Sequence, residues 1–298
     1  MNRKMTMDER IRHDLQERLE GKPLSEAAIL TPVIKVKDSE TAKGFSKLGL
    51  PGYFCGNRKA DTVVVNLNPG IGVDKADKEW DTKTRPFDHS STDAFIADYK
   101  TYCENYGEID KDNFDTFDVK TAAFFYEWDN NGIHLPCLPE DGWDDRPFCL
   151  DAKKLVLLNK LQLELVPYAS AKFEIDKKNI KLFLPYVDML LDEIFAMQRT
   201  YVVFAGNVFD DIFIAYNEEH RNKTFEGVEG PSRRPRNPFK KKDGTDMKTM
   251  LRCKVITMNY NGRRQKALIA HSFPQKSLAN AFGIYQQYGE FCHGEYIK

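Results

Sequence analysis

The stretch that decides the fold is DTVVVNLNPG, residues 61–70. Its centre, Val63–Val65, is β-branched and lacks alternating polar residues, as expected of a strand buried on both faces of a parallel sheet. The turn that follows is rigid, because Pro69 fixes its backbone φ angle, whereas Gly70 permits a positive φ and close approach of a ligand. We therefore expect a buried strand over Asp61–Asn66 that runs directly into a ligand-binding loop.

Strand and helix patterns alternate along the rest of the chain. Further strands are predicted at Leu161–Val166, Thr200–Ala205 and Lys266–Ala270, and an extended segment at Leu251–Met258. Helices are predicted at Asp8–Glu20, Asp93–Tyr106, Val119–Trp128, Leu150–Asn159, Lys178–Met197, Val208–Tyr216 and Ser277–Tyr288, and loops at Asp74–Asp88, Asn130–Arg146 and 220–250. This alternation predicts an α/β fold in which a central, mainly parallel, four-stranded sheet is flanked by helices. We expect residues 51–298 to form this single domain and residues 1–50 to pack on it as a helical and extended segment.

The composition fits a globular protein, with 41% hydrophobic and 30% charged residues among 298. No apolar run approaches the roughly 20 residues of a membrane helix, and the polar start Met1–Met5 lacks the apolar core of a secretory signal. Six cysteines occur without a C-x-x-C pair, which disfavours zinc and iron–sulfur sites. These features predict a cytoplasmic protein with reduced thiols and no membrane association, and we expect a monomer.

Polar residues follow three of the predicted strands: Asn66 and Asn68, Asn207, and His271. In parallel sheets, ligands bind at the carboxyl ends of the strands, so these side chains are candidates for one site. His271 begins the stretch HSFPQKS, in which Ser277 can cap the next helix. Each signal also has a simpler interpretation, because Asn-Pro-Gly is a good β-turn and a histidine at a strand end is often structural.

The segment LQLELVPYAS, residues 161–170, carries Gln162 and Glu164 within an otherwise apolar strand. Polar groups need partners if they are buried. A surface-facing edge strand is the alternative interpretation.

Together, these three segments resemble the uracil-DNA glycosylase superfamily. Asn68-Pro69-Gly70 matches the core of a G-x-N-P-G motif that follows the first strand in that family, although Asn66 stands where the family has glycine. His271-Ser272-Phe273-Pro274 matches the later H-P-S-P motif with Ser and Phe in altered order. The resemblance spans roughly Tyr53 to Phe291 and implies a DNA glycosylase built on a parallel α/β sheet.

The resemblance also implies a mechanism in which the target nucleotide is flipped out of the DNA into a pocket. Asn68 would position the water that attacks C1′, and His271 would stabilise charge on the leaving base. An aromatic ring, Trp80 or Phe87, would stack on the base, and the turn over Phe273–Lys276 would enter the duplex. The base pocket would include Asn66, Gln162, Glu164 and Asn207, and Ser272, Gln275, Lys276 and Ser277 would contact DNA. The scheme requires no metal or other cofactor.

Glu164 bears on the choice of base. The family commonly uses asparagine there to read uracil, but an ionised carboxylate can only accept hydrogen bonds. It would suit the exocyclic amine of cytosine and would repel the uracil carbonyl. The expected substrate is therefore uracil-like or a modified cytosine; if the strand register is shifted by two residues, Gln162 takes this position instead.

A basic loop, Arg221–Lys248, carries nine lysines and arginines against four acids. Such clusters suit phosphate contacts, so we expect this loop to bind DNA, although a solvated loop is the alternative. The residues concerned are Arg233, Arg234, Arg236, Lys240, Lys241 and Lys242.

Two other functions stay open at this stage. A non-catalytic, nucleic-acid-binding member of the same fold would accommodate the departures from both motifs. An unrelated α/β hydrolase or nucleotide-binding protein is opposed by the missing G-x-S-x-G elbow, phosphate loop and dinucleotide fingerprint. An active glycosylase would serve DNA repair or defence against phage that carry modified bases.

Overall fold

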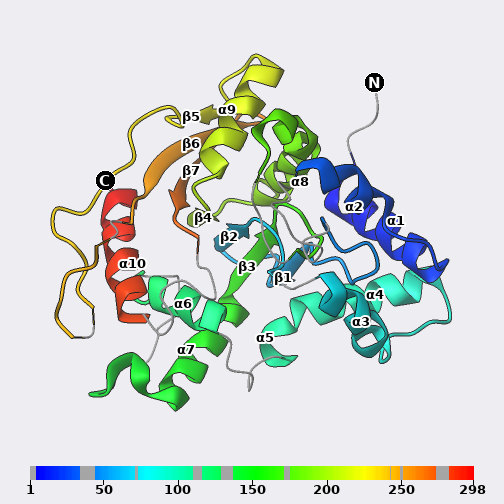
Figure 1. The fold of residues 1–298 in the computed structure, drawn as a ribbon, viewed down its shortest axis with the longest axis horizontal. Helices are drawn as coiled ribbons and strands as arrows, with labels where there is room; N and C mark the ends of the chain where they lie inside the picture. The colour runs from blue at the N-terminus through cyan, green and yellow to red at the C-terminus, as the bar shows by residue number, and fades with distance from the viewer. Residues whose placement is uncertain are drawn as a thin grey trace.

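The centre of the molecule is a mixed β-sheet (Figure 1). The computed structural model describes residues 5–33, 44–70, 73–109, 116–128, 137–170, 175–241, 243–248, 251–272 and 282–298. In this part of the chain the sheet has seven strands in the order β1-β3-β2-β4-β7-β6-β5. Their bounds are β1 Phe54–Gly56, β2 Thr62–Asn66, β3 Lys160–Glu164, β4 Tyr201–Ala205, β5 Phe225–Glu226, β6 Lys254–Tyr260 and β7 Arg263–Ala270.

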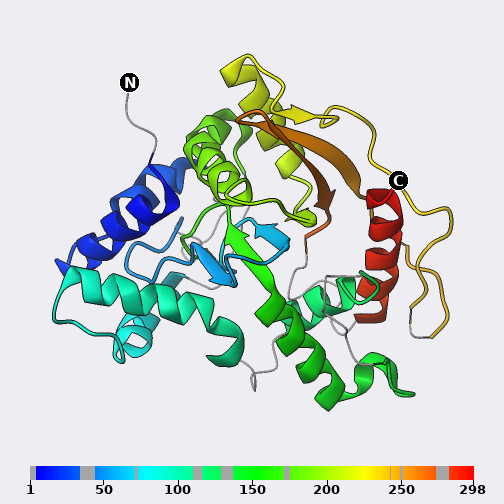
Figure 2. The same ribbon diagram turned by 180° about the vertical axis from the view of Figure 1, so that it is seen from behind.

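The four strands predicted from the sequence are the parallel centre of this sheet. β3, β2, β4 and β7 lie side by side and run in the same direction. The expected count of four is corrected to seven, because β1 adds to β3 and the β6–β5 pair adds to β7, each in antiparallel orientation. Figure 2 shows the long β6–β7 hairpin curving away from the centre.

β2 is buried as its sequence predicts. Val63, Val64 and Val65 are all 0% exposed. Val63 and Val65 belong to one hydrophobic cluster and Val64 to another, so the strand contributes to a core on each face of the sheet. This two-sided burial explains why the strand has no alternating polar residues.

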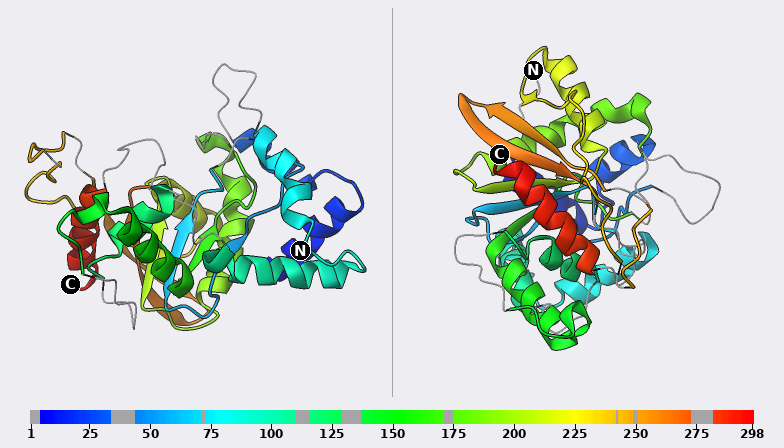
Figure 3. Two further views of the ribbon diagram at one scale, coloured as in Figure 1. Left: turned by 90° about the horizontal axis from the view of Figure 1, so that it is seen from below. Right: turned by 90° about the vertical axis from the view of Figure 1, so that its left-hand side faces the viewer.

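Helices cover both faces (Figures 1 and 3). The core that contains Val63 also includes residues of α1 (Met7–Leu19), α2 (Ser25–Leu30), α3 (Val73–Thr84), α4 (Thr92–Glu104), α8 (Leu184–Ile194) and α9 (Phe209–His220). The opposite core includes α6 (Thr116–Phe124), α7 (Arg146–Asn159) and α10 (Phe282–Tyr296). In the left view of Figure 3, α10 and α1 lie at opposite ends of the molecule with the sheet between them. The remaining helical turns are α5 (Tyr106–Ile109), η1 (Thr31–Val33), η2 (Gly142–Asp144) and η3 (Lys177–Phe183).

Several helix boundaries follow from local chemistry. The predicted helix over 178–197 is divided, with the 3-10 helix η3 ending where α8 begins, and Pro185 lies in the first turn of α8 as expected. Asp145 caps α7 by accepting from the Phe148 N–H at 2.8 Å. The predicted loop over 74–88 is wrong, because α3 occupies most of it. Among the described residues, no helix is long and apolar enough to cross a membrane.

Candidate active site at the carboxyl ends of the parallel strands

The carboxyl ends of the parallel strands meet at one edge of the sheet. Asn66 ends β2, Glu164 ends the neighbouring β3, and His271 directly follows β7. β4 lies between β2 and β7, so two strand spacings separate their ends by about 10 Å. This edge therefore combines an amide, a carboxyl group and an imidazole from three segments distant in sequence.

Asn68 is fixed by hydrogen bonds from its side-chain amide. Nδ2 donates to Ser170 Oγ at 2.8 Å, to the Pro69 carbonyl at 3.0 Å and to the Tyr168 carbonyl at 3.3 Å. The Ser170 N–H in turn donates to the Pro69 carbonyl at 3.2 Å. Because these contacts all use the nitrogen, Oδ1 is the atom of Asn68 that is oriented to accept a hydrogen bond from a ligand or water.

The backbone around Asn68 is held on two sides. Pairing with the segment after β3 continues beyond the strand, where Leu165 and Val166 donate N–H groups to the carbonyls of Asn66 and Leu67, both at 2.9 Å. On the other side Gly206 follows β4, and a Cβ there would lie 3.3 Å from the Leu67 side chain. Glycine at position 206 thus lets the Asn68 loop lie close against the end of β4.

Glu164 is buried, with 6% of its surface exposed. Its Oε1 accepts from Gln162 Nε2 at 3.0 Å and from Asn66 Nδ2 at 3.3 Å. Its Oε2 is also buried and has no hydrogen-bond partner in the described part of the chain. Burial raises the pKa of Glu164 to about 7, although the two amide hydrogen bonds and the charge of Lys160 oppose the rise.

The polar residues of β3 form a row along one face of the strand. Lys160 Nζ donates to Gln162 Oε1 at 2.8 Å and lies 3.8 Å from Asp118 on α6. Lys160 and Asp118 are buried, and sequence reasoning missed both of them. The pattern that indicates Lys160 is the alternation of polar residues at positions 160, 162 and 164 with leucines at 161 and 163, which places the three polar side chains on one face of the strand. The edge-strand alternative is wrong, because β3 lies between β1 and β2.

His271 is half-buried and anchored through its backbone. Its N–H donates to the Tyr288 hydroxyl at 2.7 Å, and that hydroxyl donates to the Arg252 carbonyl at 2.5 Å. The imidazole Nδ1 lies 3.4 Å from the carbonyl of Ser272, which is 3.5 Å from the Tyr285 hydroxyl. Tyr285 and Tyr288 of α10 are supporting residues that sequence reasoning did not find. The predicted DNA contacts at Gln275, Lys276 and Ser277 lie outside the described residues.

The two aromatic candidates for base stacking are core residues. Trp80 lies in α3, stacks on Phe95 at 5.8 Å between ring centroids, and is covered by the Arg18 guanidinium at 4.8 Å. Phe87 packs edge-on against Phe95 at 5.3 Å. Both rings are buried, so the expectation that a loop presents one of them to a base is wrong. Asn207, by contrast, is exposed between the end of β4 and Val208, the N-cap of α9.

The basic loop is partly attached to α10. Phe239 is buried and packs on Tyr288, the tyrosine that contacts His271, at 6.0 Å between ring centroids. Arg233 pairs with Glu295 at 4.0 Å and Lys240 with Asp246 at 2.5 Å. Of the six cations proposed above for DNA contact, Arg234, Arg236 and Lys241 are exposed and pair with no acid among the described residues, and Lys242 is outside those residues.

No protein family model, curated protein or solved structure matches this chain.

Proposed function

We propose that this protein is a monofunctional DNA glycosylase that hydrolyses the bond between a flipped base and its sugar, as the resemblance to the uracil-DNA glycosylase superfamily implies. The observation that carries the proposal is the meeting of Asn68, Glu164 and His271 at one edge of the parallel sheet. These groups supply the three requirements of the reaction: a positioned water, a reader of the base and a partner for the leaving group.

Asn68 serves the attacking side. Its Nδ2 is bound by Ser170 and two carbonyls, so Oδ1 accepts a hydrogen from the water and directs the water oxygen at C1′. A neutral amide is a weak base, so the glycosidic bond breaks largely before the water attacks. The water then loses its proton to solvent as the new C–O bond forms.

His271 serves the leaving side. As the base departs with the electron pair of the C1′–N bond, negative charge develops on its ring, and an imidazole N–H stabilises that charge. The backbone of His271 is tied to Tyr288, which holds the residue at the end of β7. The spacing of about 10 Å between the ends of β2 and β7 accommodates a nucleoside between Asn68 and His271.

Glu164 selects the base. Oε1 is already bound by two amide donors, whereas Oε2 lacks a partner among the described residues. An exocyclic amine such as N4 of cytosine satisfies an ionised Oε2, but the carbonyl of uracil requires the protonated form. We therefore propose a cytosine-like or modified cytosine base as the preferred substrate.

The exposed cations of the basic loop supply the DNA surface. Arg234, Arg236 and Lys241 are available for phosphate contacts, and the loop is attached to α10 beside the residue that anchors His271. Phosphates bound there lie on the side of the site where the leaving base is held.

The test is a base panel. Single-stranded and duplex oligonucleotides that carry uracil, cytosine or modified cytosines are incubated with the protein, and abasic sites are cleaved with alkali and counted. We expect release of a cytosine-type base, with a preference over uracil that rises as the pH passes through about 7, the pKa of Glu164. We expect Asn68→Ala and His271→Ala to lower the single-turnover rate roughly 10²-fold or more.

Matched controls are His220→Ala and Asn105→Ala, which remove exposed side chains at the ends of α9 and α4. DNA binding without abasic sites on any substrate would favour a non-catalytic nucleic-acid-binding protein. Robust uracil release that Glu164→Gln leaves unchanged would refute the proposed base preference and retain the glycosylase.

A further inference from the structure

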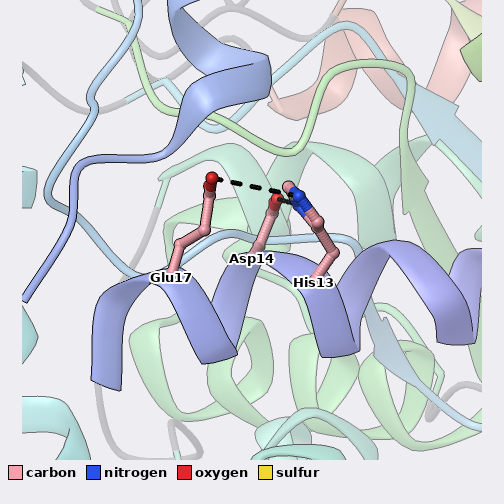
Figure 4. Close-up of side chains that lie close together, drawn as sticks. All are labelled: His13, Asp14 and Glu17. Carbon is pink, nitrogen blue, oxygen red and sulfur yellow. Dashed lines mark hydrogen bonds and ion pairs between the residues drawn. The ribbon is translucent and has the colours of Figure 1, made fainter. Parts of the chain in front are cut away.

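A buried carboxylate on the first helix connects the amino-terminal segment to the candidate site. Asp14 of α1 is 0% exposed, and its Oδ2 accepts from the hydroxyls of Tyr53 and Tyr168, each at 2.8 Å. Figure 4 shows Asp14 between His13 and Glu17 on this helix, with His13 Nδ1 3.4 Å from Asp14 Oδ1. The carboxylate thus draws together residues that are 39 and 154 positions away in the sequence.

Tyr168 belongs to the segment that holds Asn68. The amino-terminal region fixes this segment on both sides of Tyr168, because Gly52 N–H donates to the Pro167 carbonyl at 2.7 Å and Ser46 N–H donates to the Ala169 carbonyl at 2.8 Å. On its other side the segment presents the Tyr168 carbonyl and the Ser170 hydroxyl to Asn68 Nδ2. Tyr168 therefore contacts Asp14 through its side chain and Asn68 through its backbone.

We infer that Asp14 is a positioning residue: by anchoring the Tyr168 hydroxyl, it fixes the acceptors that orient the Asn68 amide. This inference rests on the proposed role of Asn68 as the residue that positions water. The physical reason is that a side-chain amide has two orientations, which exchange its oxygen and its nitrogen. Acceptors held firmly at Nδ2 select the orientation in which Oδ1 faces outward, and a flipped amide would present N–H groups that cannot accept a hydrogen from water.

The decisive variant is Tyr168→Phe, which keeps the ring and removes the hydroxyl with its short hydrogen bond to Asp14 and its longer contact, at 3.4 Å, with the Tyr186 hydroxyl. Its matched control is Tyr216→Phe, because Tyr216 is also buried in the same core and donates to the Asp188 carboxylate at 2.7 Å, between α9 and α8. Both variants lose one tyrosine–carboxylate hydrogen bond, but only Tyr168 touches Asn68. A third variant, Ser170→Ala, removes a direct partner of Asn68 and shows the size of response to expect.

The first measurement is hydrogen exchange of the Asn68 side-chain amide, followed by NMR on protein labelled with ¹⁵N-asparagine and assigned with Asn68→Ala. We expect both Tyr168→Phe and Ser170→Ala to accelerate exchange of the Asn68 amide at least ten-fold. We expect Tyr216→Phe to leave this exchange unchanged, although it lowers the melting temperature about as much as Tyr168→Phe does. Equal exchange in the two tyrosine variants would overturn the inference.

The second measurement is the single-turnover rate of base release together with the Kd for DNA. We expect Tyr168→Phe to lower the rate at least ten-fold with unchanged Kd, whereas Tyr216→Phe changes neither. The two measurements test the two proposals independently. If the wild-type protein releases no base, the proposed function is refuted. The amide exchange then still decides whether Asp14 and Tyr168 position Asn68.

Discussion

Replacing Glu164 by glutamine removes a buried charge and keeps the shape of the side chain. The glutamine Oε1 can still accept from Gln162 and Asn66, and its amide nitrogen takes the place of Oε2, which has no partner in the described structure. The substitution therefore tests the charge of Glu164 with little change in packing.

The magnitude follows from the pKa of Glu164. Burial raises it from 4.5 to about 7, so the folded protein binds this proton more tightly than the unfolded chain. For a carboxyl group with a raised pKa, stability is highest below the unfolded value and falls as pH rises toward the folded value. A difference of about 2.5 pKa units corresponds to roughly 3 kcal/mol, of which about 2 kcal/mol is lost between pH 5 and pH 8.

The assay is urea unfolding of wild type and Glu164→Gln at pH values from 5 to 8. We expect the variant to gain about 2 kcal/mol over wild type across this interval, because glutamine has no charge to bury. Glu229→Gln is the control, since it makes the same substitution at a carboxyl group that is exposed rather than buried. The comparison with wild type removes the contribution of all other titrating groups.

Parallel stability curves for wild type and Glu164→Gln would refute the reasoning. They would mean that Glu164 is solvated or paired in the folded state, and the proposed selection of an exocyclic amine by a buried Oε2 would lose its basis.

Two further predictions concern the DNA surface and the packing of α10. The first is charge reversal of the exposed cations Arg234, Arg236 and Lys241, with the Kd for DNA measured by fluorescence anisotropy at several salt concentrations. The slope of log Kd against log salt concentration should fall by about 0.9 for each DNA phosphate that the loop no longer neutralises. An unchanged slope would exclude this loop from the DNA surface. The second is Gly289→Ala, which should prevent stable folding because the added Cβ would lie 1.8 Å from a backbone oxygen of α6. The control is Gly283→Ala, whose added Cβ would have no atom within 4 Å, so its melting temperature in circular dichroism should be close to that of wild type.

The parallel centre of the fold was predictable because its signals are local. A continuous apolar run such as Val63–Val65 suits few environments other than a strand buried on both faces. The same holds for β4 and for the start of α8, where Pro185 marks the first turn.

The sequence of α3 has the spacing of an amphipathic helix, but its many charged residues led to the prediction of a loop. Its buried positions, Ala76, Trp80 and Thr84, recur at four-residue spacing, and Phe87 follows three residues later. This is the period of an amphipathic helix, and it explains why Trp80 and Phe87 lie in the core.

The environment of β3 depended on contacts that no local pattern encodes. Gln162 and Glu164 fit an exposed edge strand equally well until β1, about a hundred residues earlier in the chain, pairs with the outer side of β3. Burial then turns Glu164 from an ordinary surface acid into a group whose pKa is about 7.

The sequence by itself determined that Asn68 and His271 follow buried parallel strands, because hydrophobic runs and turn residues act over a few neighbouring positions. Only the tertiary structure decided which atoms of Asn68 are bound, that Glu164 is buried, and that Asp14 reaches Tyr168 across 154 positions. The physical reason is that the hydrogen-bond partners and the burial of a side chain depend on which distant segments pack together. The sequence around a single polar residue does not identify the partner that it contacts in the folded protein.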